Sequence, residues 1–130
     1  MITLIAVLAG GLAGAIARQG LFAAVQDRAA TRFPVGILLV NLSGAFVLGL
    51  LYGAGVTSHW PHWLAIGVQT GIIGAYTTYS TWAVDSLLLA RRREGKAADA
   101  GQRAAAVNLA GSLAAGVLLV WAGASAGGAL

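Results

Sequence analysis

The chain has 130 residues, of which 58% are hydrophobic and only 9% are charged. A soluble domain carries about 25% charged residues, so this composition excludes a cytosolic enzyme, a disordered tail and a nucleic-acid-binding module. The chain has no cysteine, which excludes disulfides and cysteine-based metal sites. The composition indicates an integral membrane protein, with the lipid bilayer as its main partner and no nucleic acid.

Four apolar stretches are long enough to cross a bilayer, which takes about 20 helical residues. Their approximate bounds are 2–25, 34–56, 63–90 and 104–126. The links between them are too short to fold separately, and residues 91–103 are expected to form a loop. We therefore expect an all-α integral membrane protein with four transmembrane helices, forming a single domain over residues 1–130.

The basic residues predict the orientation of the chain. Seven of them lie in the first and third links, and the opposite side has none: they are Arg28, Arg32, Arg91, Arg92, Arg93, Lys96 and Arg103. Cytoplasmic loops are enriched in Lys and Arg, so both termini are predicted outside, in a multi-pass protein of the cell membrane. Arg18 lies at the basic end of the first span and either attracts anions or extends to the interface.

The third span has the composition of a broken helix. Gly71, Gly74 and a run of hydroxyl and β-branched residues weaken the helix near its middle. A break at membrane depth is tolerated only where the freed backbone lines a cavity or binds an ion, and freed carbonyls suit a cation such as Na⁺. The alternative is a continuous helix whose Thr hydroxyls bond to the preceding turn. We expect the break between Gly74 and Thr78.

The polar residues within the spans do not form a catalytic set. They lack a Ser/His/Asp grouping and a carboxylate pair, so no enzymatic activity is expected. Asp85 lies near the end of the third span, where it forms a surface ion pair or couples transport to protons. His59 and His62 have no third ligand nearby and are typical of an interfacial belt together with neighbouring tryptophans.

Three segments carry a recognisable pattern, namely residues 10–18, 33–44 and 71–82. Residues 71–82, GIIGAYTTYSTW, resemble the GxxGGxTTFSTF signature of the Fluc (CrcB) family of fluoride channels. Residues 33–44, FPVGILLVNLSG, resemble its FPxGTLxVNxxG segment, and residues 10–18, GGLAGAIAR, resemble its GGxxGAxxR opening. The likeness extends over all four spans, in order.

The resemblance implies a channel made of two antiparallel subunits, through which fluoride leaves the cell passively. It further implies a structural sodium ion at the dimer interface, held by the backbone carbonyls of Gly74 and Thr77. Arg18 would lie near a vestibule. The anion pore would be lined by Asn41, Thr78, Tyr79, Trp82, Asn108 and Ser112.

Neutral donors at these positions suit fluoride, which is small and strongly hydrated. Asn41 would donate its amide N–H to the anion. Tyr79 and Trp82 stand where the family motif has Phe, and ring edges carry partial positive charge that can face an anion. Asn108 stands where the family often has Tyr. A buried cation in the path would bind the anion too tightly for release.

The charge bias predicts the kind of dimer. An antiparallel homodimer needs a chain that inserts both ways and therefore has little Lys/Arg bias, whereas this chain has a strong bias. We therefore expect a related subunit of opposite bias as partner, with a homodimer as the other possibility. Two alternative functions are a small proton-coupled multidrug exporter that uses Asp85, and a non-conducting partner subunit of a heterodimeric channel.

Overall fold

A computed structural model describes residues 1–29, 31, 33–91 and 96–129, with the side chains of residues 96–98 left out. The chain is all-helical, as the sequence predicts. Its elements are α1 (Ile2–Ala29), α2 (Val35–Gly53), η1 (Val56–Ser58), α3 (His62–Ile66), η2 (Gly67–Ile73), α4 (Gly74–Tyr76), α5 (Tyr79–Ala90), α6 (Lys96–Ala106), η3 (Val107–Gly111) and α7 (Ser112–Gly127). Of these, η2 and η3 are π-helical turns.

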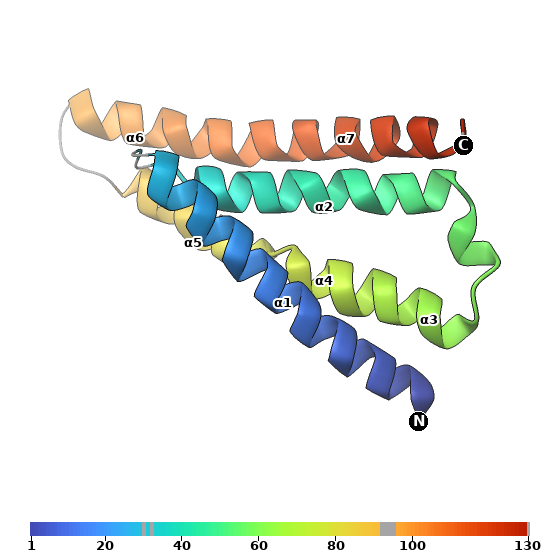
Figure 1. Ribbon diagram of the computed structural model, residues 1–130. Helices are drawn as coiled ribbons and strands as arrows, with labels where there is room; N and C mark the ends of the chain where they lie inside the picture. Colours follow the sequence, from blue (N-terminus) through green and yellow to red (C-terminus); the bar gives the residue numbers. More distant parts are fainter. Residues whose placement is uncertain (30, 32, 92–95, 130) are drawn as a thin grey trace.

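The second and fourth spans form the most extensive helix pair of the described chain. Helices α2 and α7 run side by side (Figure 1), with their closest contacts in the second half of α2. A side chain at Gly49 would overlap the carbonyl oxygen of Val120, and one at Gly123 would overlap that of Phe46. Because apolar burial does not drive helix association in lipid, such close backbone contact is what holds the pair together.

The first span packs in the same way against the first half of the third span. Gly10 and Gly14 of α1 contact backbone atoms of η2, while Gly71 of η2 contacts the backbone of Val7. Small residues therefore allow close helix packing on both sides of the molecule. Each seam depends on glycine because any Cβ there would meet backbone, which cannot rotate away.

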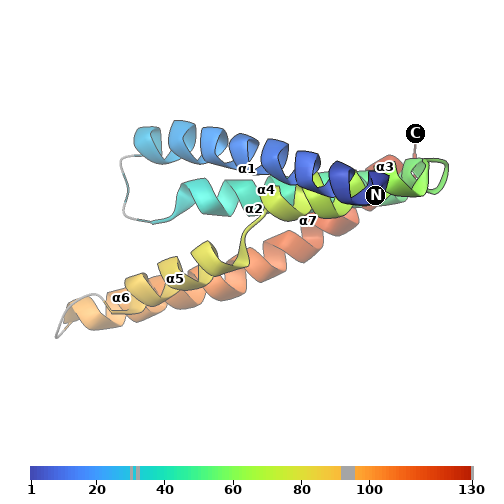
Figure 2. The same cartoon turned by 90° about the horizontal axis from the view of Figure 1, so that it is seen from below.

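The third span is broken, as predicted. Helix α4 ends at Tyr76 and α5 begins at Tyr79. Thr77 and Thr78 between them are extended, with ψ angles of 159° and 124°. The break lies at the end of the predicted interval, since Gly71 and Gly74 are themselves helical. Beyond it, α5 leaves α1 and lies beside α6 (Figure 2).

Three helices of the described chain are long and apolar enough to cross a membrane. Their bounds are Ile2–Ala29, Val35–Gly53 and Asp99–Gly127. The remaining expected span is divided by the break into shorter helices, which explains why it is not among them.

The expected loop over residues 91–103 is wrong for most of its length. The fourth helix begins at Lys96 instead of near Ala104, because α6 continues directly into η3 and α7. Ala, Lys, Gln and Arg are good helix formers, but their polarity kept this segment out of a span chosen by hydropathy. Arg32, Arg92 and Arg93, which support the predicted orientation, lie outside the described residues.

Candidate functional site

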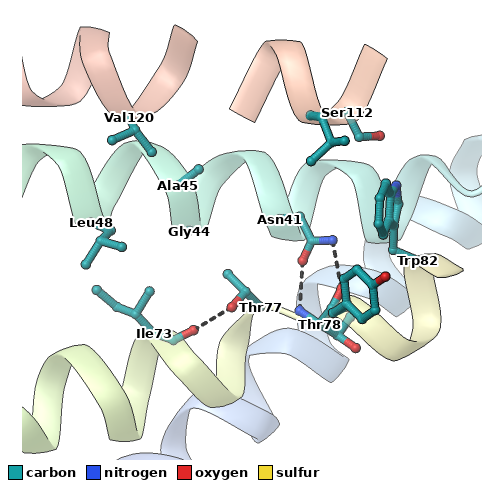
Figure 3. A pocket seen from close by; sticks show the side chains of 12 residues that line it. Asn41, Gly44, Ala45, Leu48, Ile73, Thr77, Thr78, Trp82, Ser112 and Val120 are labelled. Carbon is teal, nitrogen blue, oxygen red and sulfur yellow. Dashed lines mark hydrogen bonds between the residues drawn. The ribbon is translucent and has the colours of Figure 1, made fainter. Parts of the chain in front are cut away.

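A cavity of about 360 Å³ lies beside the break in the third span. One end is lined by polar and aromatic side chains and the other by aliphatic ones such as Leu48 and Val120, and the lining carries no charge (Figure 3). The polar end brings together six residues that the sequence indicates: Asn41, Thr77, Thr78, Tyr79, Trp82 and Ser112.

Asn41 pairs with the backbone at the break through both ends of its side-chain amide. Its Nδ2 donates to the carbonyl of Thr78 at 3.0 Å, and its Oδ1 accepts from the Thr78 N–H at 2.8 Å. The Thr78 N–H has lost its helical partner and needs a replacement at membrane depth, while the Thr78 carbonyl, at the N-cap of α5, gains a second donor. One N–H of Asn41 is thus used by the fold, and the second remains beside the cavity.

The same bonds deprive two carbonyls of their usual helical donors. In a continuous helix the Thr78 N–H would reach the Gly74 carbonyl, and the Thr81 N–H would reach the Thr77 carbonyl. Instead, Thr78 bonds to Asn41, and the Thr81 N–H donates to Thr78 Oγ1 at 3.3 Å. Carbonyl oxygens released in this way are ligands for a hard cation.

Thr78 also starts the second half of the span. Its hydroxyl acts as the N-cap of α5, accepting from the Thr81 backbone and bonding to the Thr81 hydroxyl at 3.1 Å. Before the break, the Thr77 hydroxyl donates to the carbonyl of Ile73 at 3.0 Å. The bond to the preceding turn, which we considered as the mark of a continuous helix, therefore occurs in the last turn before the interruption.

Two aromatic rings follow the break on one face of α5. The centroids of Tyr79 and Trp82 are 5.4 Å apart, with the ring planes tilted by 55°. Tyr79 is 77% exposed in the single chain, whereas Trp82 is only 8% exposed. Tyr79 is therefore open to contact with another chain or with lipid, while Trp82 is fixed within its own subunit.

Asn108 and Ser112 lie differently with respect to the cavity. Ser112 lines it, while Asn108 does not and is buried behind Trp82. The Asn108 amide donates to Ser86 Oγ at 2.8 Å, and its backbone carbonyl accepts from the Trp82 indole N–H at 3.2 Å. Among the described residues, Asn108 Oδ1 and Ser112 Oγ are buried without a hydrogen-bond partner.

Arg18 and Gly74 also lie outside the cavity lining. Arg18 is half-buried on α1, and Gly74 is exposed on the surface of the single chain. The sequence reasoning missed two polar contacts, those of Ser86 and of Gln26. Gln26 donates to the Phe33 carbonyl at 3.3 Å and accepts from the Gly36 N–H at 3.0 Å, so it positions the start of α2.

Comparison with known proteins identifies the family. A model of the family described as CrcB-like protein, Camphor Resistance (CrcB), matches residues 5–124. The chain belongs to the CrcB family. A 41% identical relative from Moorella thermoacetica, named "Fluoride-specific ion channel FluC 2", covers 93% of each chain.

Other relatives of this CrcB protein have similar names. A protein of Symbiobacterium thermophilum, "Fluoride-specific ion channel FluC 2", is 39% identical over 90% of each chain. "Fluoride-specific ion channel FluC" of Acidobacterium capsulatum is 39% identical over 88% of this chain and 86% of its own. Membership in this family of channels confirms a multi-pass membrane protein that is not an enzyme, and it gives no support to the multidrug exporter.

Proposed function

We propose that this chain is a subunit of a fluoride-specific ion channel that lowers cytoplasmic fluoride by passive efflux. The names of the relatives support the ion. The structural observation that carries the proposal is the uncharged polar end of the cavity, formed where the third helix is interrupted. Neutral donors replace water around an anion without binding it too strongly for release.

The anion path uses the donors that the fold leaves available. Asn41 offers its second N–H, and Ser112 offers a hydroxyl that is buried without a partner among the described residues. The Thr78 hydroxyl lines the path with its hydrogen donated to Thr81 Oγ1, while Tyr79 and Trp82 present ring edges with partial positive charge. Asn108 does not line the cavity and acts through Trp82, whose indole N–H it binds with its backbone carbonyl. Arg18 attracts anions toward the vestibule.

The residues present fit a structural sodium ion. The carbonyls of Gly74 and Thr77 have both lost their helical donors, and carbonyl oxygens suit a hard cation. These two groups would hold the ion together with those of a partner subunit, since Gly74 lies on the surface of the single chain. Bound by these carbonyls, a sodium ion would supply a fixed positive charge at the interface between protomers.

The partner in the antiparallel dimer is a related subunit of opposite charge bias. The seven basic residues of the first and third links hold this chain in one orientation, with both termini outside. The exposure of Tyr79 and Gly74 supports a site that a second protomer completes. A topology assay in cells that finds equal numbers of chains in both orientations would contradict this assignment.

Fluoride efflux from liposomes tests the function. The chain is reconstituted alone and with a sister subunit. Fluoride release is then followed with a fluoride-selective electrode after the membrane potential is dissipated. We expect fluoride efflux from the mixed liposomes and little chloride efflux. Efflux from the chain alone would show a homodimer, and no efflux in either preparation would refute the channel.

A further inference from the structure

The side chain of Trp82 carries a donor that a phenyl ring lacks. The ring lines the polar end of the cavity together with Asn41 and Ser112 (Figure 3). An indole N–H is a stronger donor than the C–H edge of a ring. In a fluoride path it would hold the anion more tightly than a ring edge does.

The structure directs this N–H away from the anion. It donates to the backbone carbonyl of Asn108 at 3.2 Å, in the π-helical turn η3. The ring that remains at the cavity is therefore bounded by C–H groups. In its contact with an anion, the tryptophan then behaves like a phenyl ring.

A closed ring of three hydrogen bonds maintains this arrangement. The Trp82 indole donates to the Asn108 carbonyl, the Asn108 amide donates to Ser86 Oγ at 2.8 Å, and Ser86 Oγ donates back to the Trp82 carbonyl at 2.8 Å. Asn108 and Ser86 are 1% and 3% exposed. Buried networks of this kind restrict side-chain orientation more than single bonds do.

We propose that Ser86 and Asn108 are positioning residues that keep the Trp82 indole N–H out of the anion path. This inference rests on the proposed function of the cavity, but the hydrogen-bonded ring can be tested separately from ion flux. Without the Ser86 hydroxyl, the Asn108 amide loses its acceptor and the ring of bonds opens. The bond from the indole to the Asn108 backbone carbonyl then stands without its two supporting bonds, and the indole turns its N–H toward the cavity more readily.

The first experiment observes the indole proton directly. The protein with its partner is labelled with ¹⁵N-tryptophan in detergent micelles, and the Trp82 resonance is assigned by its loss in Trp82→Phe. We expect this resonance to be insensitive to added fluoride in the unchanged protein and to shift with fluoride in Ser86→Ala. Ser86→Thr, which keeps a hydroxyl, should restore the insensitive resonance. An unchanged resonance in Ser86→Ala would overturn the inference.

The second experiment measures fluoride efflux in a double-mutant cycle. Ser86→Ala is expected to slow efflux about fivefold, the size expected from one buried hydrogen bond. The same change in a Trp82→Phe background should have little effect, because phenylalanine has no N–H to misdirect. Equal slowing in both backgrounds would show a merely structural serine and refute the proposal. Ser125→Ala, on the exposed end of α7, is the matched control.

The two experiments separate the possible failures. If the unchanged protein conducts no fluoride, the proposed function fails, while the resonance still reports whether the ring of bonds exists. If the unchanged protein conducts and the cycle shows no coupling between Ser86 and Trp82, only the positioning role fails.

Discussion

The α2–α7 pair and the broken third span are held by different forces. In the pair, Gly49 and Gly123 bring two backbones into contact, and each helix satisfies its own hydrogen bonds. At the break, the Thr78 N–H has no helical acceptor and donates instead to Asn41 of another helix, which also donates to the Thr78 carbonyl. Steric fit thus builds the frame, while polar pairing builds the site. Substitutions in the pair should therefore disturb helix packing, whereas substitutions at the break should disturb the polar site.

The largest effect is expected in the frame. Gly49→Leu places a side chain against the Val120 carbonyl, and overpacking of this kind costs about 3 kcal/mol. We expect loss of the monodisperse peak in size-exclusion chromatography. Gly20→Ala is the control, because a Cβ there meets nothing within 4 Å. A monodisperse Gly49→Leu protein would show that backbone contact does not hold the pair.

The next effect is expected where polar pairing replaces helical bonds. Asn41→Asp keeps the acceptor for the Thr78 N–H but removes the donor to its carbonyl, and it adds a negative charge to the anion path. A charge inside the membrane costs about 3 kcal/mol, so fluoride efflux should fall about 100-fold. Gln19→Glu, on the exposed face of α1, is the control. Efflux near the original rate would remove Asn41 from the path.

Removal of sodium tests the released carbonyls. Replacing Na⁺ by N-methylglucamine on both sides of the liposome membrane should lower fluoride efflux, because a large organic cation does not fit between carbonyl oxygens. Returning Na⁺ should restore the rate, whereas K⁺ should restore it poorly. Efflux that is independent of the cation would refute the sodium site while leaving the anion path intact.

The smallest effect is expected at Thr77. Thr77→Val keeps the β-branched shape and the backbone carbonyl but removes the hydroxyl bond to Ile73. The protein should lose about 1 kcal/mol of stability, as for one hydrogen bond, with nearly unchanged efflux and sodium dependence. Loss of sodium dependence in this variant would assign the ligand to the hydroxyl and not to the backbone.

The sequence predicted a break in the third span because local composition weakens the helix there. It placed the break between Gly74 and Thr78, and the interruption lies at the end of that interval, at Thr77 and Thr78. Its position depends on Asn41, which is 37 residues away in the sequence. A local pattern does not contain that pairing.

Other features were missed because their residues are of common types that carry no specific signal in the sequence. Ser86 reads as a common helix serine, and only the fold brings it to Asn108. The start of the fourth helix at Lys96 was missed because hydropathy identifies the apolar segment that crosses the membrane, whereas the helix continues into polar sequence beyond that segment. The cavity lining was predicted more fully, since the family resemblance indicated Asn41 and Ser112 by position.

The interruption at Thr77 and Thr78 also separates the third span into two halves whose positions depend on different neighbours. The half of the span before it packs on α1, and the half after it packs on α6 and η3. An extended dipeptide joins them, so a tilt of one half does not propagate as rigid rotation of the other. A substitution at Gly14, which contacts the backbone of Ile72, would therefore displace the first half of the span and its cavity wall without altering any lining residue.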